Sequence, residues 1–484
     1  MGAIIALVNK KGENASEAAV AMLKILKNEQ IEEFGIASPN LSKVSKNIEK
    51  LLEKDLCSPI IVGKTFSKIL TTDKPQPTEF ENATIVFEGR LYPRPLNISD
   101  AEAFALEAQR CRESVKSLLR KASGDFVFAI AEEKRVIAGR DTMGVYPLYY
   151  GENESFAALA SERKALWKIG IKRAQSFPPG HVATFDRDGI KFENVRTLDY
   201  SEPKQITMRA AAKKLQKLLE TSVMEKVAGL KHVAVAFSGG LDSSIIAYLA
   251  KKSGITVDLI HVSLRNQPET EYAKRVAREL KLPIHVYLYE EDDVKRVLSK
   301  ILWLIEGSDF VDVSIGVPFY WVAEKAAEMG FKVMLTGQSA DELFGGYKRY
   351  VQDFVQYEKK KAHTTFFRDI SEMHRTNFER DFKICDFHNV ELRLPFAAYE
   401  IAKFAINLPV EVKIEGEENG LRKLVLRQVA ENLGLPNLVT RRPKKAMQYA
   451  TGVSKTLKNL AKKEGLTAKE YLQRKFQAAF KGVI

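Results

Sequence analysis

The chain has 484 residues, which is too long for one typical hydrophobic core and predicts two domains. Its content of 45% hydrophobic and 28% charged residues is typical of a globular protein, and no apolar run suggests a membrane-spanning helix. The three cysteines, Cys57, Cys111 and Cys385, are too far apart for a C-x-x-C zinc site or a disulfide framework, so we expect a cytoplasmic location.

The formal net charge of +13 leaves two interpretations open. A concentrated basic patch could bind nucleic acid, whereas lysines interleaved with acids form an ordinary solvated surface. Segments 271–280 (EYAKRVAREL) and 47–56 (NIEKLLEKDL) favour the solvated surface. Nucleic acid is therefore an unlikely partner here, although the charge does not exclude it.

The first part of the chain alternates short strands with two helical stretches. Ile4 to Val8 predict a buried strand, and apolar residues at helical spacing predict helices over 15–29 and 99–122. Further strands are expected where β-branched and aromatic runs lie between Gly, Pro and Asp, at 83–92, 124–141, 148–151 and 181–193. This pattern indicates helices packed on antiparallel sheets.

The pattern changes near Pro203, where a polar stretch predicts a domain boundary. We therefore expect domains at 1–202 and 203–484. A helix over 208–227 is followed by buried apolar runs that predict parallel strands joined by helices, at 232–237, 257–264, 283–289 and 332–337. Beyond Tyr350 the chain is expected to be mostly helical.

The strand at 232–237 leads into a glycine-rich turn and then a helix. Adjacent glycines let backbone N–H groups converge, and the helix N-terminus favours negative charge, so the turn predicts a phosphate site. An aspartate in this turn would repel a bare phosphate, which indicates an intervening Mg²⁺. The Gly-Lys-Ser/Thr ending of a Walker loop is missing. The turn reads Ser238, Gly239, Gly240, Leu241, Asp242, Ser243, Ser244.

A second polar cluster, 338–347, follows the strand at 332–337. Ligands of an open α/β sheet gather at the carboxyl ends of its strands, so we expect Asp341 to face Asp242 and to share Mg²⁺ with it. Asp341 could instead cap the following helix, and one position can serve both purposes.

Together, FSGGLDSS and GQSADELFGGY resemble the synthetase domain of the glutamine-dependent asparagine synthetases, which cleaves ATP to AMP and pyrophosphate. ERDFKICDFHNVELRLPF and RRPKKAMQYATGV support the resemblance, and GDFVFAIAEEKRVIAGRDTMGVYPLYYG and ASERKALW are similar to the family's glutaminase domain. The resemblance covers nearly the whole chain. It implies an α+β, Ntn-hydrolase-like first domain of antiparallel sheets sandwiched with helices. An α/β parallel-sheet pyrophosphatase-loop domain with a helical C-terminal part would follow.

The resemblance also implies roles for single residues. Asp242 and Asp341 would hold Mg²⁺, and Lys444 or Lys445 would meet the phosphates or the charge that develops during amide formation. Glu391 and Arg393 match the V-E-x-R-x-P-F pattern, as catalytic groups or as an internal salt bridge. ATP and pyrophosphate would be bound by Ala236, Ser238, Gly239, Gly240, Leu241, Asp242, Ser243, Ser244, Val262, Thr336 and Gly337.

The glutaminase half departs from the family at its reacting groups. The family opens with Met-Cys, whose cysteine is the nucleophile, whereas Gly2 has no side chain to react. Glu88, before Gly89, replaces the asparagine of the oxyanion segment, and a carboxylate cannot donate a hydrogen bond to an oxyanion. Asp100 still matches the acid that binds the glutamine amine. We predict an inactive glutaminase.

The synthetase half departs at Gln338, which replaces the first glutamate of the family's Gly-Glu-Gly/Ala-x-Asp-Glu motif. That acid is thought to act near the acyl-adenylate, so restoring glutamate at position 338 is expected to raise asparagine formation.

The function indicated is an ATP-dependent ligase that adenylates aspartate or a related carboxylate for attack by ammonia or an amine. Alternatives are a tRNA-modifying adenylating enzyme, which the positive charge favours, and a non-catalytic regulatory paralogue, which Gln338 and Glu88 favour. The sequence leaves open the carboxylate, the amine and the oligomeric state, a homodimer included.

Overall fold

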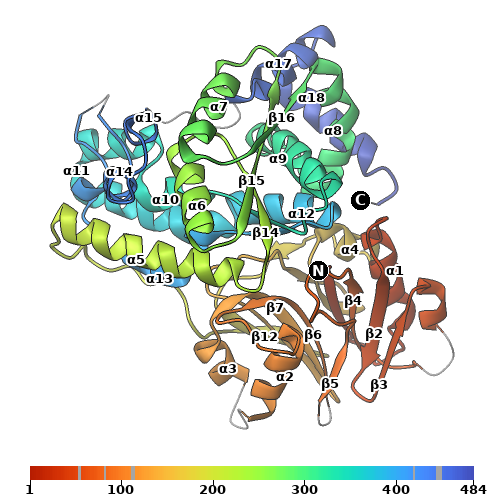
Figure 1. Ribbon diagram of the computed structural model, residues 1–484. Coiled ribbons are helices and arrows are strands. Elements are labelled where there is room, and N and C mark those ends of the chain that lie inside the picture. The colour runs from red at the N-terminus through yellow and green to blue at the C-terminus, as the bar shows by residue number, and fades with distance from the viewer. Residues whose placement is uncertain (53–55, 81–82, 111–114, 418–419, 443–449, 484) are drawn as a thin grey trace. The chain divides into compact units, whose positions relative to one another are not determined.

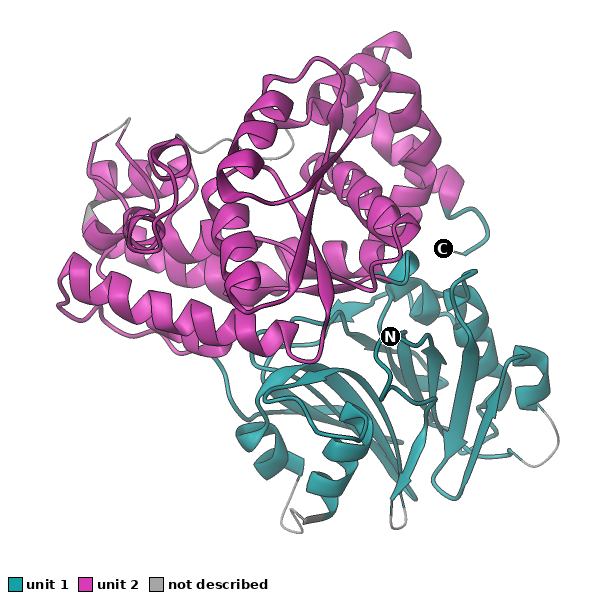
Figure 2. Ribbon diagram, viewed as in Figure 1, with its two compact units in different colours: residues 1–197, 386–389, 480–484 teal, residues 198–385, 390–479 magenta. Residues whose placement is uncertain are grey.

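The computed structural model describes residues 1–52, 56–80, 83–110, 115–417, 420–442 and 450–483. The chain divides into two compact units (Figure 2). Unit 1 comprises residues 1–197, 386–389 and 480–484, and unit 2 comprises residues 198–385 and 390–479. Unit 1 therefore takes two short segments from late in the chain, which no local sequence pattern indicates.

Unit 1 is built on two antiparallel sheets (Figure 1). The strand order is β11-β9-β10-β1-β4-β2-β3 in the seven-stranded sheet and β13-β12-β8-β7-β6-β5 in the six-stranded sheet. The strands of this unit are β1 (Ile4–Asn9), β2 (Glu33–Ser38), β3 (Leu41–Ser45), β4 (Ile60–Phe66), β5 (Thr78–Phe80), β6 (Ala83–Leu91), β7 (Gly124–Glu132), β8 (Arg135–Arg140), β9 (Tyr149–Glu152), β10 (Phe156–Ala160), β11 (Gln175–Ser176), β12 (His181–Asp186) and β13 (Gly189–Asn194).

Helices cover the sheets of unit 1. Helix α1 (Ser16–Leu26), the 3₁₀ turn η1 (Ile48–Leu52) and α4 (Arg163–Lys168) pack on the seven-stranded sheet. Helices α2 (Asp100–Arg110) and α3 (Val115–Lys121) pack on the six-stranded sheet, whose core includes Phe87 and Phe104. Both helices lie within the stretch 99–122 that the sequence predicts to be helical, and residues 111–114 between them lie outside the described residues. Every residue of β1 is buried, as its unbroken apolar run predicts.

Unit 2 contains a five-stranded parallel sheet in the order β16-β15-β14-β17-β18. Its strands are β14 (His232–Ala236), β15 (Thr256–Leu264), β16 (Ile284–Tyr289), β17 (Val333–Leu335) and β18 (Glu391–Arg393). The chain runs from β14 outward to β16 and then returns to the other side of β14. The order therefore reverses between β14 and β17, and ligands of open α/β sheets bind at the carboxyl ends of the strands at such a point.

Helices make up most of the rest of unit 2 (Figure 1). In chain order they are α5 (Met208–Val227), α6 (Leu241–Lys252), α7 (Pro268–Leu280), α8 (Glu291–Ile305), α9 (Phe310–Glu328), α10 (Ala340–Phe344), α11 (Lys348–Met373), the π-helical turn η2 (His374–Phe378), α12 (Glu379–Phe387), η3 (Pro395–Ala397), α13 (Tyr399–Ile406), η4 (Val410–Val412), α14 (Leu424–Asn432), α15 (Asn437–Thr440), α17 (Val453–Lys463) and α18 (Ala468–Ala479). Among the described residues, no helix combines the length and the apolar character needed to cross a membrane.

Candidate functional site

The turn after β14 has the geometry of an anion-binding loop. Gly239 has φ +72°, and a Cβ there would lie 2.9 Å from the Ala273 Cα, so this close backbone turn requires glycine. The Ser238 hydroxyl accepts from the Gly240 N–H at 3.2 Å and lies 3.3 Å from the Ser243 hydroxyl. Two hydroxyls thus lie at the N-terminus of α6, where the helix dipole favours a phosphate.

The segment after β17 lies directly against this loop. A Cβ on Gly337 would be 2.7 Å from the Asp242 Cβ, so the backbone of the second motif touches the first turn of α6. Ser339 has φ +77°, an uncommon conformation for a residue with a side chain. The two motifs that the sequence places at different strand ends therefore meet at the switch point of the sheet.

Lys423 joins the two aspartates. Its Nζ lies 2.7 and 2.6 Å from the two carboxylate oxygens of Asp242 and 2.6 Å from Oδ1 of Asp341. The lysine side chain is only 3% exposed. Sequence reasoning missed Lys423, because it matches no glycine-rich motif and its one local signal is its place before helix α14. The lysines predicted for this role, Lys444 and Lys445, lie outside the described residues.

The remaining predicted nucleotide-binding residues surround the same strand ends. Ala236 ends β14, and Leu241 begins α6. Thr336 is buried and its Oγ1 accepts from the Gln338 N–H at 3.3 Å. Two others are also buried: Val262 near the end of β15, and Ser244 in the first turns of α6.

Glu391 and Arg393 form a buried ion pair on β18. The Arg393 Nε donates to the Glu391 Oε1 at 2.6 Å, and both side chains are at most 3% exposed. The Arg393 Nη1 also donates to the backbone oxygen of Lys226. This geometry favours the structural interpretation of the V-E-x-R-x-P-F pattern over the catalytic one.

Both ends of the segment 338–342 are held by contacts with side chains later in the chain, among them the carboxylate of Asp381, which sequence reasoning missed. The Gln338 Nε2 donates to the Asp381 Oδ2 at 2.6 Å. At the other end of the motif, the Glu342 Oε1 accepts from the Tyr347 hydroxyl at 2.6 Å and from the Asn377 Nδ2 at 2.8 Å. Burial and then the neighbouring Asp341 raise the pKa of Glu342. The π-helical turn η2 and helix α12 therefore hold both ends of the segment 338–342.

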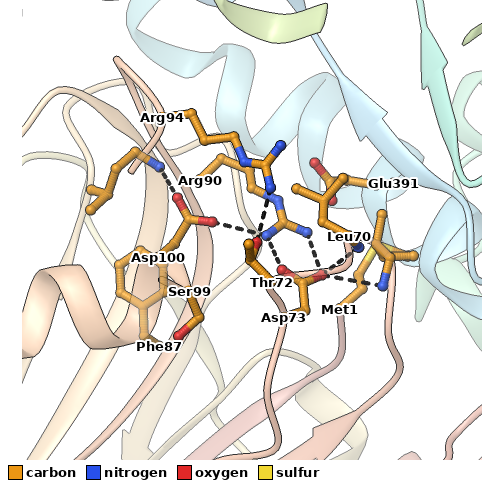
Figure 3. A network of polar contacts seen from close by, with 12 residues as sticks. Met1, Leu70, Thr72, Asp73, Phe87, Arg90, Arg94, Ser99, Asp100 and Glu391 are labelled. Carbon is orange, nitrogen blue, oxygen red and sulfur yellow. Dashed lines mark hydrogen bonds and ion pairs between the residues drawn. The ribbon is translucent and has the colours of Figure 1, made fainter. Parts of the chain in front are cut away.

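In unit 1, the glutaminase-like residues are joined by a network of polar contacts (Figure 3). Arg90 binds Asp73 at 2.6 Å and Asp100 at 3.0 Å. Lys64 forms a buried ion pair with Glu88. Burial opposes ionisation of Asp73, but the Arg90 guanidinium holds its pKa well below the ordinary value. The remaining cavity has a volume of about 20 Å³, which is room for roughly one water molecule.

Gly2 and Gly89 both have positive φ, +153° and +138°. A Cβ at Gly2 would lie 1.9 Å from the backbone oxygen of Thr65, so this backbone has no space for a side chain at position 2. A Cβ at Gly89 would lie 2.2 Å from the backbone oxygen of Asp125. Both glycines are thus required by close backbone packing.

Carboxylates are the candidate metal ligands of unit 2. Among the described residues, no group of three or more His, Cys, Asp and Glu side chains could hold a metal ion. Asp242 and Asp341 nevertheless converge on one cationic atom, the Lys423 Nζ, as they would on a bridging cation. Carboxylates are suitable ligands for Mg²⁺, which is commonly held by one or two carboxylates together with substrate phosphates. The two aspartates therefore fit a magnesium–nucleotide site.

Comparison with known proteins gives matches in both units. Residues 214–362 and 355–480, together more than half of the chain, match the asparagine synthase family model. Residues 66–168 match the glutamine amidotransferase domain model. A protein of Methanocaldococcus jannaschii assigned as glutamine-hydrolysing asparagine synthetase 1 is 27% identical, over 99% of this chain and 100% of its own length.

Plant relatives match over a smaller part. Glutamine-hydrolysing asparagine synthetase 2 of Arabidopsis thaliana is 27% identical over 73% of this chain, which spans 62% of the plant protein. Among solved structures, the glutamine phosphoribosylpyrophosphate amidotransferase of B. subtilis matches with a TM-score of 0.34 and 15% identity, over 59% of this chain and 80% of that chain.

Proposed function

Because the chain belongs to the asparagine synthase family, whose members are ATP-dependent ligases, we propose that it activates a carboxylate as an acyl-adenylate and joins it to ammonia or an amine. Pyrophosphate leaves in the first step. Aspartate, or an acid related to it, is the proposed carboxylate. The observation that carries the proposal is the meeting of two motifs at the switch point of the unit 2 sheet, with Asp242 and Asp341 bound to one lysine.

Each group has a chemical task in this proposal. The hydroxyls of Ser238 and Ser243 and the N-terminus of α6 bind the phosphates that become pyrophosphate. Asp242 and Asp341 would hold Mg²⁺, which neutralises phosphate charge when bound. Lys423 places a positive charge between the same carboxylates, so it stabilises them without the nucleotide and can contact a phosphate with it.

The finer assignments are also proposals. Val262, Thr336 and Gly337 would line the adenine and ribose. Lys444 or Lys445 would contact the phosphates or the charge developing in amide formation. Glu391 and Arg393 hold β18 by their ion pair and need not touch substrate.

Asp242→Asn tests the site assignment. The substitution keeps the size of the side chain and removes its charge, so titration calorimetry should show that Mg-ATP binds about tenfold or more weakly, the effect of losing one charged contact. Circular dichroism should show an intact fold. A matched control is Asp369→Asn, which removes an aspartate from a salt bridge with Arg349 outside this site. Equal ATP affinity in Asp242→Asn and wild type would show that the nucleotide binds elsewhere.

We further propose that unit 1 does not hydrolyse glutamine. Gly2 supplies no nucleophile, Glu88 is paired with Lys64, and Asp100 is paired with Arg90. Glutamate release from glutamine, measured with and without ATP, should stay at the background of a buffer control. Turnover that a thiol-reactive glutamine analogue blocks would mean that a cysteine reaches this site.

Two assays separate this function from the alternatives. Pyrophosphate release over a panel of carboxylates, with ammonia as acceptor, is expected to identify a substrate. Filter binding to total tRNA is expected to remain weak and salt-sensitive. Tight tRNA binding with no carboxylate-dependent pyrophosphate release would favour a nucleic-acid-modifying enzyme, and neither activity would favour a regulatory paralogue.

A further inference from the structure

Gln338 is a neutral amide, and its side chain is hydrogen-bonded to a buried carboxylate. The family motif has a glutamate at this position, and its replacement by a neutral amide removes a negative charge. The structure has a carboxylate directly beside the substituted position, because the Asp381 Oδ2 lies 2.6 Å from the Gln338 Nε2. Asp381 comes from helix α12, 43 residues further along the chain.

Asp381 is fully buried, and its second oxygen is also bound. The Arg380 Nε donates to the Asp381 Oδ1 at 2.7 Å, and the Arg380 Nη1 donates to Asp312 at 2.8 Å. Burial raises the pKa of Asp381 above its ordinary value, and the Arg380 guanidinium opposes this shift by pairing with the ionised carboxylate. A carboxylate only accepts hydrogen bonds, so the Gln338 amide must direct its Nε2 toward Asp381 and its Oε1 away from it.

We propose that Asp381 is a positioning residue for the ligase reaction: it supplies from helix α12 the negative charge that the family motif carries at position 338, and it fixes the orientation of the Gln338 amide. This inference rests on the proposed function, since it concerns the step in which ammonia or an amine attacks the activated carboxylate. The Gln338 carbonyl oxygen would face that step as a hydrogen-bond acceptor, polarised by the charge behind it.

The contact between Gln338 and Asp381 changes the result expected when glutamate is restored at position 338. A glutamate at position 338 would place a second carboxylate against Asp381 at hydrogen-bonding distance, and two such groups cannot both be ionised. Gln338→Glu alone is therefore expected to lower amide formation, whereas the sequence alone predicts a rise.

The decisive test is an exchange of the two groups. Asp381→Asn removes the charge and leaves two neutral amides, and Gln338→Glu replaces the amide donor with a second carboxyl group. The double variant again places one amide against one carboxylate, with the carboxylate at 338 and the amide at 381. Each single variant should lose about tenfold or more in kcat for amide formation, the effect of one charge-assisted hydrogen bond. The double variant should regain most of that loss, and Mg-ATP affinity should change little in all three.

A matched control separates positioning from general loosening of helix α12. Lys383 lies on helix α12, and its Nζ is 2.9 Å from the Oε2 of the buried Glu306. Glu306→Gln removes this acid and leaves the Gln338–Asp381 pair intact. This variant should lose stability without the selective loss of amide formation, and Asp381→Asn should not rescue it.

These measurements distinguish failure of the proposed function from failure of the inference about Asp381. If wild type shows no ATP-dependent pyrophosphate release with any carboxylate, the proposed function fails and this inference fails with it. If wild type is active but the double variant is no better than the poorer single variant, only the inference is overturned. Wild-type activity in Gln338→Glu alone would also overturn it, because the two carboxyl groups would then not be coupled.

Discussion

Lys413 gives a quantitative prediction, because it is a fully buried lysine with no salt bridge to any acid in the part of the chain that the structure describes. It lies over the ring of Phe366, a member of an apolar cluster of unit 2, and its Nζ has no hydrogen-bond partner among the residues that the structure describes. Its ammonium group lies 4.2 Å from the centre of the Phe366 ring. Burial lowers its pKa from 10.5 to about 7.

The magnitude follows from linkage between protonation and folding. Between pH 7 and 10.5 the unfolded chain holds a proton on Lys413 that the folded chain does not, so stability rises with pH through this window. Below pH 7, protonating the buried Lys413 lowers the free energy of unfolding by about 5 kcal/mol, which corresponds to the fall in pKa from 10.5 to about 7. At pH 7 itself this loss is about 4 kcal/mol, and at pH 10 it falls to about 1 kcal/mol.

Lys413→Met removes the titrating group and keeps a side chain of similar length. We expect the variant to be more stable than wild type by about 4 kcal/mol at pH 7, less any packing cost, and this advantage should shrink by about 3 kcal/mol at pH 10. Urea unfolding of both proteins at constant ionic strength measures the difference between their free energies of unfolding. The contributions of the other titrating groups are the same in both proteins and cancel. Lys383→Met is the control. It leaves the buried Glu306 without its cation and should be destabilising by about 3–5 kcal/mol.

A difference between Lys413→Met and wild type that does not change from pH 7 to pH 10 would refute the reasoning. It would mean that Lys413 stays protonated in the folded protein, so that some acceptor or water reaches its ammonium group.

Two further predictions concern the other buried charges. Arg90→Met should destabilise unit 1 by about 3–5 kcal/mol at pH 7, because it leaves Asp73 and Asp100 buried without their cation. The lowered pKa of Asp73 means that the pair stabilises above pH 3.8, so the defect should diminish as pH falls through 3.8; a loss that is equal at pH 3 and pH 7 would contradict this. Lys423→Met leaves Asp242 and Asp341 facing each other, so Mg²⁺ should raise the melting temperature of the variant more than that of wild type, and equal shifts would show that these aspartates bind no Mg²⁺.

The sequence predicted those parts of the fold that depend on local patterns. Long β-branched runs gave the expected strands of the parallel sheet, and the glycine pair at the end of β14 gave the loop before α6. Strand β18 was missed because two of its three residues, Glu391 and Arg393, are charged and form no apolar run, and it is stabilised by pairing with β17. The contacts of Gln338 with Asp381 and of Asp242 with Lys423 join residues 43 and 181 positions apart, which no local pattern can indicate.

Both units depart from the family motifs, and the charged side chains next to these departures have different effects in the two units. A buried charge without a partner is costly, so a compensating group beside a change of charge stabilises the fold. In unit 1 the compensation occupies the groups that would bind a ligand, because Arg90 takes the Asp100 carboxylate that the resemblance assigns to the glutamine amine. In unit 2 the charge of Asp381 leaves the proposed nucleotide-binding groups unaltered, because Asp381 contacts Gln338 and Arg380, whereas Asp242 and Asp341 are bound by Lys423. The cost of burying charge therefore supports the proposed loss of glutamine hydrolysis in unit 1. In unit 2 it supports the proposed transfer of a negative charge from position 338 to Asp381 with the ligase activity retained.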